Sequence, residues 1–409
     1  DRLAGTDSID TQQIIAFFQP SREAFLEYDI AKLISTLANP EQTVIGLVSG
    51  IPMAGGFDPQ NRRMASPWVV YQQAEQLFEI RDLGTEFDAV DDDVNLLWIV
   101  QPRNLANATL YAIDQYLMRG GKALIFVDPL AETDAVSPPD MPQGLPALGQ
   151  GSNLPALFQA WGLEFSSGEA LADAQLALQI TSGSLGQPVR HYGYLGIGAD
   201  NMNADDIVTA ELNAVNVAVA GALRSTAQNT ATFEPLMRSS ERAAQIPTTR
   251  FSVLPDASAL QKDFAPSGES YVIAARLGGI LPSAFPDGAP ADEGADSAAT
   301  ETIGDASVAD HADHLSESSQ PTSIIVVADV DMLSDPLWVQ VQDFFGQQLA
   351  TAFASNGAFA INALYNLSGS SDLFSVRSRA SFTRPFTRVE RLRADAEAEF
   401  RQKELRLQA

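Results

Sequence analysis

Short apolar runs alternate with amphipathic segments along much of the chain. The predicted strands cover 43–50, 94–100, 123–127 and 324–328, and the predicted helices cover 25–38, 67–78, 107–119, 338–353 and 358–367. The strands are continuous apolar runs, as in strands buried on both faces of a parallel sheet. The helices carry apolar residues at a spacing near 3.6. Strands that alternate with helices predict an α/β fold with a doubly wound, mostly parallel sheet.

The middle of the chain is less regular. Residues 131–155 are rich in proline, glycine and serine, and 156–280 contain strand-like stretches at 215–223 and 271–277. We therefore expect a discontinuous α/β domain over 14–140 and 321–380. A smaller inserted α/β lobe is expected over 150–285.

Two later segments are set apart by their charge. Residues 286–320 hold nine acidic residues and no lysine or arginine, so we expect a disordered acidic loop. Residues 377–409 reverse this bias, with nine basic and five acidic residues. The apolar positions of this last stretch fall on one helical face, which predicts a protruding amphipathic helix over 385–409 that leads toward a membrane.

Basic residues in this helix and directly before it are candidate contacts. Arg384, Arg388, Arg391 and Arg393 would face anionic lipid headgroups or an acidic partner. The alternative is that they balance neighbouring carboxylates on a solvated helix.

Composition excludes several function classes. With 52 acidic and 25 basic residues the net charge is -27, which disfavours nucleic-acid binding. The 409-residue chain has no cysteine, so thiol nucleophiles and thiolate metal sites are excluded. No phosphate-binding or dinucleotide-binding glycine motif occurs, so we expect no cofactor. With three histidines, a multi-histidine metal centre is not expected.

No apolar run is long enough to cross a bilayer. Because the chain opens without methionine and ends inside a helical pattern, we expect a fragment whose membrane segments have been removed.

A candidate ligand site lies where the predicted strands end. Ligands of open α/β sheets bind beyond the carboxyl ends of the strands. The residues expected to line such a crevice are Ser49, Gly55, Gly56, Asp128, Asp329 and Asp331. The alternative is that the aspartates cap helices or turns and that the glycines only shape a turn. Ser49 has no recognisable histidine partner, so a hydrolase triad is poorly supported.

Several phrases together resemble one family. They are FFQPSREAFLEYDIAKLI from Phe17, GLVSGIPMAGGFDP from Gly46, TLYAIDQYLMRGGKALIFVDP from Thr109, VVADVDMLSDPLWVQ from Val326 and NALYNLSGSSDLFSVRSR from Asn362. This combination resembles the GldG-like auxiliary component of gliding-motility ABC transport systems. The resemblance implies membrane anchors at the chain ends, and a soluble part on the periplasmic side of the inner membrane, beside an ABC permease and ATPase. The sheet also resembles the amidotransferase-like and flavodoxin-like folds, but the cysteine nucleophile of the amidotransferases is missing.

Together these features predict a non-catalytic domain that binds or positions a partner or a substrate. The alternative is a hydrolase, or a glycan-binding or lipid-binding domain, that uses the strand-end crevice.

Overall fold

The computed structural model describes residues 43–58, 63–136, 148–182, 187–226, 231–252, 257–290, 314–344 and 347–369. All but the last of these residues belong to one compact unit, 41–368. The predicted helices at 25–38 and 385–409 lie outside the described residues, as do most of the acidic segment and the candidate contacts Arg384, Arg388, Arg391 and Arg393.

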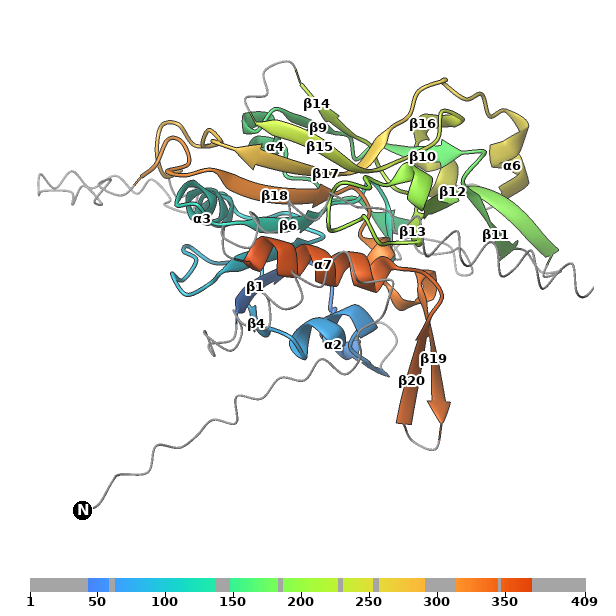
Figure 1. The fold of residues 1–409 in the computed structure, drawn as a ribbon, viewed down its shortest axis with the longest axis horizontal. Coiled ribbons are helices and arrows are strands. Elements are labelled where there is room, and N and C mark those ends of the chain that lie inside the picture. The colour runs from blue at the N-terminus through green and yellow to red at the C-terminus, as the bar shows by residue number, and fades with distance from the viewer. Residues whose placement is uncertain are drawn as a thin grey trace, which may run out of the picture. The chain divides into compact units, whose positions relative to one another are not determined.

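The core of the fold is a mixed nine-stranded sheet (Figure 1). Its first five strands are parallel and lie in the order β4 (Glu79–Asp82), β1 (Val44–Ser49), β5 (Leu96–Val100), β6 (Ala123–Phe126) and β18 (Thr322–Val327). Every residue of β5 and β6 is buried, which is why these strands read as unbroken apolar runs. The expected α/β class is therefore confirmed.

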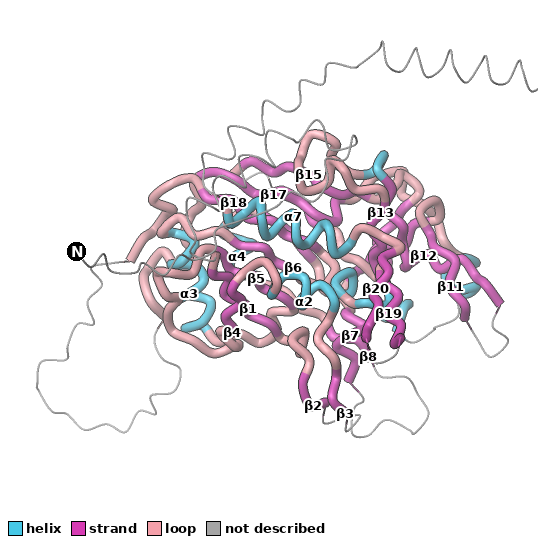
Figure 2. Tube along the Cα trace, turned by 60° about the horizontal axis from the view of Figure 1, so that its bottom comes forward, coloured by secondary structure: helices cyan, strands magenta, loops and turns pink. Residues whose placement is uncertain are grey.

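Helices cover both faces of the parallel strands (Figure 2). On one face α2 (Val69–Glu75) and α7 (Asn356–Ser368) pack in a single core with Ile45 and Trp98. On the other face α3 (Asn107–Met118) and α4 (Pro155–Ala160) pack with Leu97 and Ile99. Neighbouring residues of β5 thus enter opposite cores, as the two-residue period of a strand requires.

The sheet continues into the segment expected to form a separate lobe. The antiparallel strands β17 (Val272–Gly279), β14 (Leu223–Ser225) and β9 (Leu163–Phe165) follow β18, and β15 (Thr232–Arg238) pairs with β17. The rest of that segment forms the pair β10 (Glu169–Asp173) and β16 (Ala243–Pro247), the sheet β11 (Ala177–Ser182), β12 (Gln187–Gly198) and β13 (Ala214–Ala218), and the short helices α5 (Thr249–Ser252) and α6 (Ala257–Lys262). The division into two domains stays a prediction, but the expected α/β domain and the expected inserted lobe both contribute strands to the nine-stranded sheet.

Two expected elements are corrected. The helix expected at 338–353 is instead a hairpin of β19 (Val339–Phe344) and β20 (Gln347–Ala352). The alternation Val339-Gln340-Val341-Gln342 has the two-residue period of a strand, and this period was a better guide to the structure than the apolar content of 338–353. The strand expected at 215–223 is broken into β13 and β14, because Val219 adopts a left-handed backbone with φ 52°.

Other small elements lie at the margins of the sheet. These are the hairpins β2 (Gly56–Asp58) with β3 (Arg63–Ala65) and β7 (Ala131–Val136) with β8 (Leu148–Gln150), and the 3-10 turns η2 (Ala199–Asn201), η4 (Asp331–Leu333) and η5 (Asp335–Leu337). The described ends of the acidic segment are joined, since the Ser283 amide donates to the Ser316 carbonyl at 2.9 Å. The disorder predicted for its middle lies outside the described residues.

The parallel strands place their carboxyl ends at one edge. Counted among themselves in chain order, these five strands are arranged two-one-three-four-five. The winding therefore reverses between β1 and β5, and such a reversal is where open α/β sheets bind ligands.

Candidate functional site

Three buried aspartates gather beyond β6 and β18. Asp128 and Asp329 are fully buried and Asp331 is 2% exposed. The two oxygens of Asp128 accept the amides of Leu130 and Val330, each at 2.7 Å. These bonds join the loop after β6 to the loop after β18, which lie about 200 residues apart in sequence.

The other two aspartates also bind backbone amides. Asp329 accepts the amide of Ala218, at the end of β13, at 2.7 Å and that of Met332 at 3.0 Å. Asp331 accepts the amides of Glu132 and Thr133 at 2.7 and 2.9 Å, and also the Thr133 hydroxyl. The carboxylates therefore fix the loops that surround the strand ends, which is the use anticipated by the turn and cap alternative.

Burial makes these carboxyl groups hard to ionise. It raises the pKa of Asp128 well above the usual range, and the charges of Asp331 and Asp329 raise it further. Burial and the Asp331 charge raise the pKa of Asp329 in the same way. The amide bonds act in the opposite direction but do not outweigh these effects.

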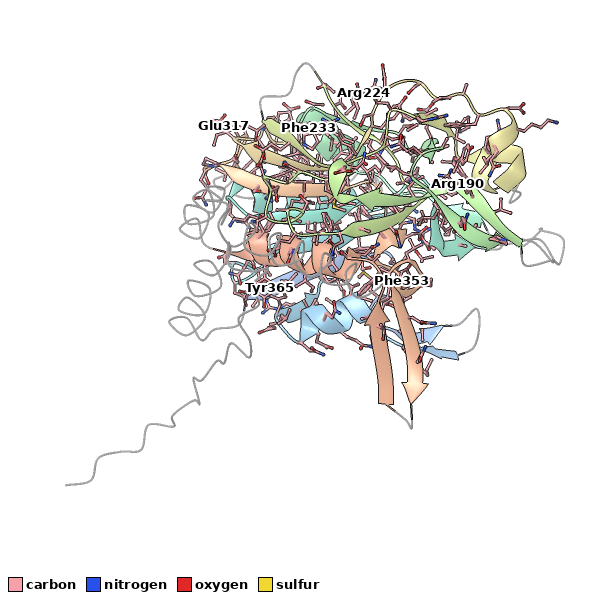
Figure 3. The ribbon with its side chains drawn as sticks, turned by 45° about the vertical axis from the view of Figure 1, so that its right-hand side comes forward. Arg190, Arg224, Phe233, Glu317, Phe353 and Tyr365 are labelled. Atoms are coloured by element: carbon pink, nitrogen blue, oxygen red, sulfur yellow. The ribbon has the colours of Figure 1, made fainter. Side chains whose placement is uncertain are left out.

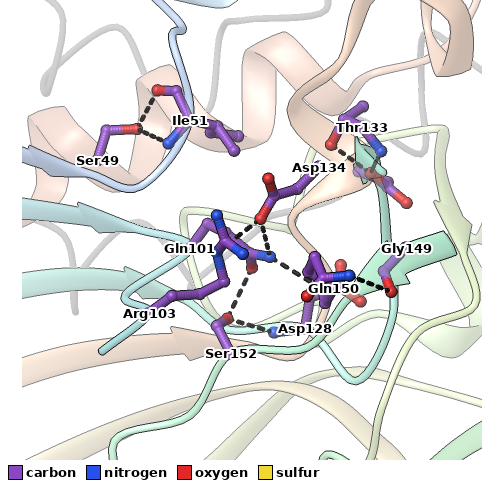
Figure 4. Close-up of polar contacts among 11 residues, drawn as sticks. Ser49, Ile51, Gln101, Arg103, Asp128, Thr133, Asp134, Gly149, Gln150 and Ser152 are labelled. Carbon is purple, nitrogen blue, oxygen red and sulfur yellow. Dashed lines mark hydrogen bonds and ion pairs between the residues drawn. The ribbon is translucent and has the colours of Figure 1, made fainter. Parts of the chain in front are cut away.

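A buried glutamine fills the reversal point between β1 and β5 (Figure 4). Gln101 is fully buried, and its amide nitrogen donates to Asp134 at 3.1 Å and to the Gln150 carbonyl at 3.0 Å. Its oxygen accepts the Ser152 hydroxyl at 2.7 Å, and that hydroxyl accepts the Asp128 amide at 3.1 Å. An ion pair of 2.8 Å between Arg103 and Asp134 completes the network. Side chains of the protein thus occupy the place where a ligand would enter.

Glycine allows the two loops to approach at this point. A Cβ on Gly50 would lie 2.2 Å from the Gln101 carbonyl oxygen, so no larger residue fits there. Gln101 itself has φ 52°, which a residue before proline adopts rarely. Gln101 was not among the residues expected to line the crevice, because a glutamine at a strand end has no signature of its own.

Ser49 and the two glycines are not joined to the aspartates by any hydrogen bond described. The Ser49 hydroxyl donates to the Ile51 carbonyl at 2.7 Å, and Figure 4 draws this pair apart from the Gln101 network. Gly55 has φ 74° and a Cβ there would meet the Ala65 carbonyl at 2.6 Å, whereas Gly56 has φ 120° and open space beside it. Both glycines serve the turn into β2, and their role in ligand binding stays a prediction.

Another fully buried aspartate, Asp173, was not predicted from the sequence. Asp173 is fully buried at the end of β10. It accepts the Ser240 amide at 2.7 Å and hydroxyl at 2.8 Å, and the amides of Gln175 and Leu176 at 2.7 and 3.0 Å. Nothing in the local sequence marks this residue, because its partner Ser240 lies 67 positions away.

Three cavities of the described region lie away from the strand-end aspartates. One of about 540 Å³ is polar and lies beside Ser240 and Arg238, one of about 700 Å³ lies between α2 and α7, and one of about 730 Å³ lies along β9 and β14. Asp128, Asp329 and Asp331 line none of them. Binding at the aspartates would therefore require the loops around them to open.

The described residues include no cluster of three or more His, Asp or Glu placed to hold a metal ion. His191 is 7% exposed, and burial lowers its pKa to about 4. His314 accepts from or donates to the Tyr111 hydroxyl at 3.1 Å. Among the helices described, none is long and apolar enough to cross a bilayer.

The fold and this site define an α/β protein in which strand-end carboxylates secure loops. The chain belongs to the family described as "ABC-type uncharacterized transport system", whose model matches residues 42–363. It is thus an auxiliary component of an ABC transport system, as the sequence resemblance predicted. The sequence matches no curated protein.

Two solved structures are similar to the chain. The mmIFT52 N-terminal domain is 10% identical with a TM-score of 0.39, over 80% of this chain and 98% of that one. A cold-adapted β-galactosidase from Rahnella sp. R3 is 14% identical with a TM-score of 0.17, over 64% of this chain and 40% of that one.

Proposed function

We propose that this chain is the non-catalytic, extracytoplasmic domain of a GldG-like auxiliary protein, and that it binds or positions a partner of an ABC transporter. The family match over residues 42–363 carries this proposal. The partners would be the permease and the ATPase, and the domain would lie on the periplasmic side of the inner membrane. Membrane segments beyond the present chain, together with Arg384, Arg388, Arg391 and Arg393, would hold it near the bilayer.

The chemistry of the strand ends supports a binding role over catalysis. A general acid or nucleophile must reach its substrate within hydrogen-bonding distance. Asp128 and Asp329 are fully buried and their oxygens already accept backbone amides. Their arrangement stabilises loops, and it leaves recognition to the surface.

Co-purification from membranes tests the proposal. The full-length protein, solubilised in mild detergent with the transporter encoded beside it, should recover the permease and ATPase. The partner control is an unrelated permease expressed at the same level. Recovery of neither subunit from intact membranes would refute the proposal.

The absence of cysteine gives a direct test of location. The chain has no cysteine, so an Asp92→Cys substitution at an exposed turn gives this domain one reactive thiol, and the protein without the substitution is the labelling control. A membrane-impermeant maleimide should label it in intact cells whose outer membrane has been made permeable. Labelling only after lysis would place the domain on the cytoplasmic side instead.

Ligand binding at the strand ends is kept as a second proposal, because open α/β sheets bind ligands beyond the carboxyl ends of their parallel strands. It would involve Ser49, Gly55, Gly56, Asp128, Asp329 and Asp331. A glycan or lipid that binds the folded domain should raise its melting temperature. The shift should disappear in an Asp128→Asn, Asp329→Asn double variant. A ligand whose shift survives in the double variant binds elsewhere, and a hydrolytic activity that survives would exclude these aspartates from catalysis.

A further inference from the structure

An apolar groove without charged side chains lies between α2, α7 and the base of the β19–β20 hairpin. We call it the uncharged groove. Its volume is about 700 Å³. It is lined by Gln73, Gln76, Leu77, Asn213, Ala214, Trp338, Ala352, Phe353, Ala354, Ser355, Ala358, Ile361 and Asn362. The wall is thus apolar, and the polar side chains along it are neutral amides and one hydroxyl.

This groove exposes apolar surface that an isolated protein would bury. Phe353 is 60% exposed and Leu77 is 43% exposed. These are two of the five large apolar side chains that are exposed in the described region. Exposed apolar residues that gather in a concave site, with neutral polar groups around them, are typical of a surface that binds a partner.

The groove is formed before any partner arrives. Trp338 is 2% exposed, and its carbonyl accepts the amides of Phe353 and Ala354 at 2.8 and 3.2 Å. The Ser355 amide donates to the Ala214 carbonyl at 2.7 Å. A Cβ on Gly357 would lie 2.4 Å from the Trp338 ring, so helix α7 is packed tightly against this floor. Such a site loses little conformational entropy on binding.

The hairpin beside the groove extends the same neutral surface. In Figure 1 β19 and β20 project from the body, and Figure 3 places Phe353 where the hairpin meets it. The two strands form a sheet of their own. Residues 339–352 include one charged residue, Asp343, whereas charged residues make up 19% of the chain. Val341 on β19 is 39% exposed. Two-stranded hairpins are marginally stable alone, so a partner that packs on this one would stabilise it.

Charge decides which occupant suits this surface. An anionic membrane surface or a second copy of this chain would meet a body of net charge -27, and no lysine or arginine lines the groove to offset the repulsion. A charged partner segment would lose its hydration there without gaining an ion pair. An uncharged apolar peptide segment incurs neither cost, and the amides of Gln73, Gln76 and Asn362 can bond its backbone.

We propose that the uncharged groove and the adjoining hairpin bind an uncharged, apolar extracytoplasmic segment of the transporter's permease subunit. This inference rests on the proposed function, and it specifies the surface and the partner chemistry. Apolar side chains of the segment would contact Leu77 and Phe353. The hydrophobic contact would supply most of the affinity, since no ion pair is available.

Photo-crosslinking tests the location of the contact. A photoreactive phenylalanine analogue is placed at Phe353 or at Leu77 in the full-length protein, in membranes that hold the whole transporter. The control position is Ile280, which is 42% exposed and lies outside the groove. We expect crosslinks to the permease from the two groove positions and none from the control. Crosslinks from the groove to lipid, to a second copy or to the ATPase would overturn the proposal.

Substitution tests the chemistry of the contact. Phe353→Asp and Leu77→Asp should each lower the amount of permease recovered by at least about tenfold, because each puts a charge into a neutral site. Phe353→Leu keeps the site apolar and should lower recovery less than Phe353→Asp, whereas Ile280→Asp, outside the groove, should recover as much permease as the unchanged protein. Circular dichroism and melting temperature, measured on each variant, confirm that it folds.

The outcomes separate this inference from the proposed function. If the unchanged protein recovers no permease, the proposed function fails. If the unchanged protein and the two Asp variants recover equal amounts, the transporter role stands and the uncharged groove is refuted as its contact. Loss of folding in both Asp variants leaves the crosslinking experiment to decide.

Discussion

Asp173 offers the sharpest test of the idea that buried carboxylates hold this fold together. The perturbations are Asp173→Ala and Asp173→Asn. The side chain is fully buried and accepts four hydrogen bonds, two of them from the amide and hydroxyl of Ser240. Alanine removes all four bonds. Asparagine keeps an oxygen for the three donors that bond Oδ1, and it places an NH₂ group against the Ser240 amide.

The number of hydrogen bonds lost in each variant gives the expected decrease in the free energy of unfolding. A buried donor left without an acceptor costs about 1–3 kcal/mol. Gln175 is exposed and Leu176 is partly exposed, so their amides can regain water, whereas Ser240 is 6% exposed. We expect Asp173→Ala to lower the free energy of unfolding by about 3–5 kcal/mol, and Asp173→Asn by about 1.5–3 kcal/mol.

Equilibrium urea unfolding at neutral pH measures these values, provided that the transition is two-state. The matched control is Asp92→Asn at an exposed position, which should change stability by no more than about 0.5 kcal/mol. If Asp173→Ala behaved like this control, the reasoning about buried carboxylates would be wrong. An alanine variant more stable than the asparagine variant would show that placing an NH₂ group against the Ser240 amide destabilises the fold by more than the remaining hydrogen bonds of the asparagine stabilise it.

Three other predictions concern stability. The raised pKa values of Asp128 and Asp329 give a stabilisation that is full below the unfolded-state pKa of about 3.9 and is lost as pH rises through the folded-state pKa. Between pH 4 and 8 the free energy of unfolding should therefore fall less steeply in Asp128→Asn than in the unchanged protein. An equal slope in the two proteins would contradict this. Gly357→Ala should lower the free energy of unfolding by about 1–3 kcal/mol, because the added Cβ would lie 2.4 Å from Trp338. Gly198→Ala has no atom within 4 Å of its added Cβ, so its melting temperature should stay close to that of the unchanged protein in the same thermal melt. Arg276→Met should lower the free energy of unfolding by about 3–5 kcal/mol in urea, because it removes the ion-pair partner that lies 2.8 Å from the largely buried Asp206 and breaks a bond to Asn366. Arg81→Met, whose ion pairs are exposed, should lower it far less. Similar losses in the two arginine variants would show that burial of the Arg276 pair has no special effect.

The parallel half of the fold was well predicted from local pattern. Strands β1, β5, β6 and β18 were expected within one or two residues of their observed ends. These strands are buried on both faces, so their sequences are almost wholly apolar and the signal is strong. Helices α2, α3 and α7 were also found close to where apolar spacing placed them.

The antiparallel half was harder to predict. Two of its strands, β9 and β14, have only three residues each, too few to show a clear period. The hairpin β19–β20 was taken for a helix, because 338–353 is rich in apolar residues and the alternation over Val339 to Gln342 was not given weight. Whether such a segment pairs with itself depends on where the body leaves room for it, which local sequence does not encode.

At the candidate site, too, local sequence predicted some features and long-range packing decided the others. Sequence reading selected Asp128, Asp329 and Asp331 because they follow predicted strands, and the structure brings these three together. It could not foresee that Gln101 and Ser152 fill the reversal point, since these two residues are 51 positions apart and touch through long-range packing. The uncharged groove was missed for the same reason, as its lining comes from three separate stretches of chain.

By itself, the sequence determined the fold class, the absence of thiol chemistry, the acidic body and the resemblance to the ABC-transport auxiliary family, because each of these depends on composition or on local periodicity. The tertiary structure alone decided that the strand-end carboxylates bind backbone amides, that the sheet continues through the middle of the chain, and that α2, α7 and a hairpin enclose a neutral groove. Those features depend on contacts between residues far apart in sequence, and such contacts exist only once the chain has folded.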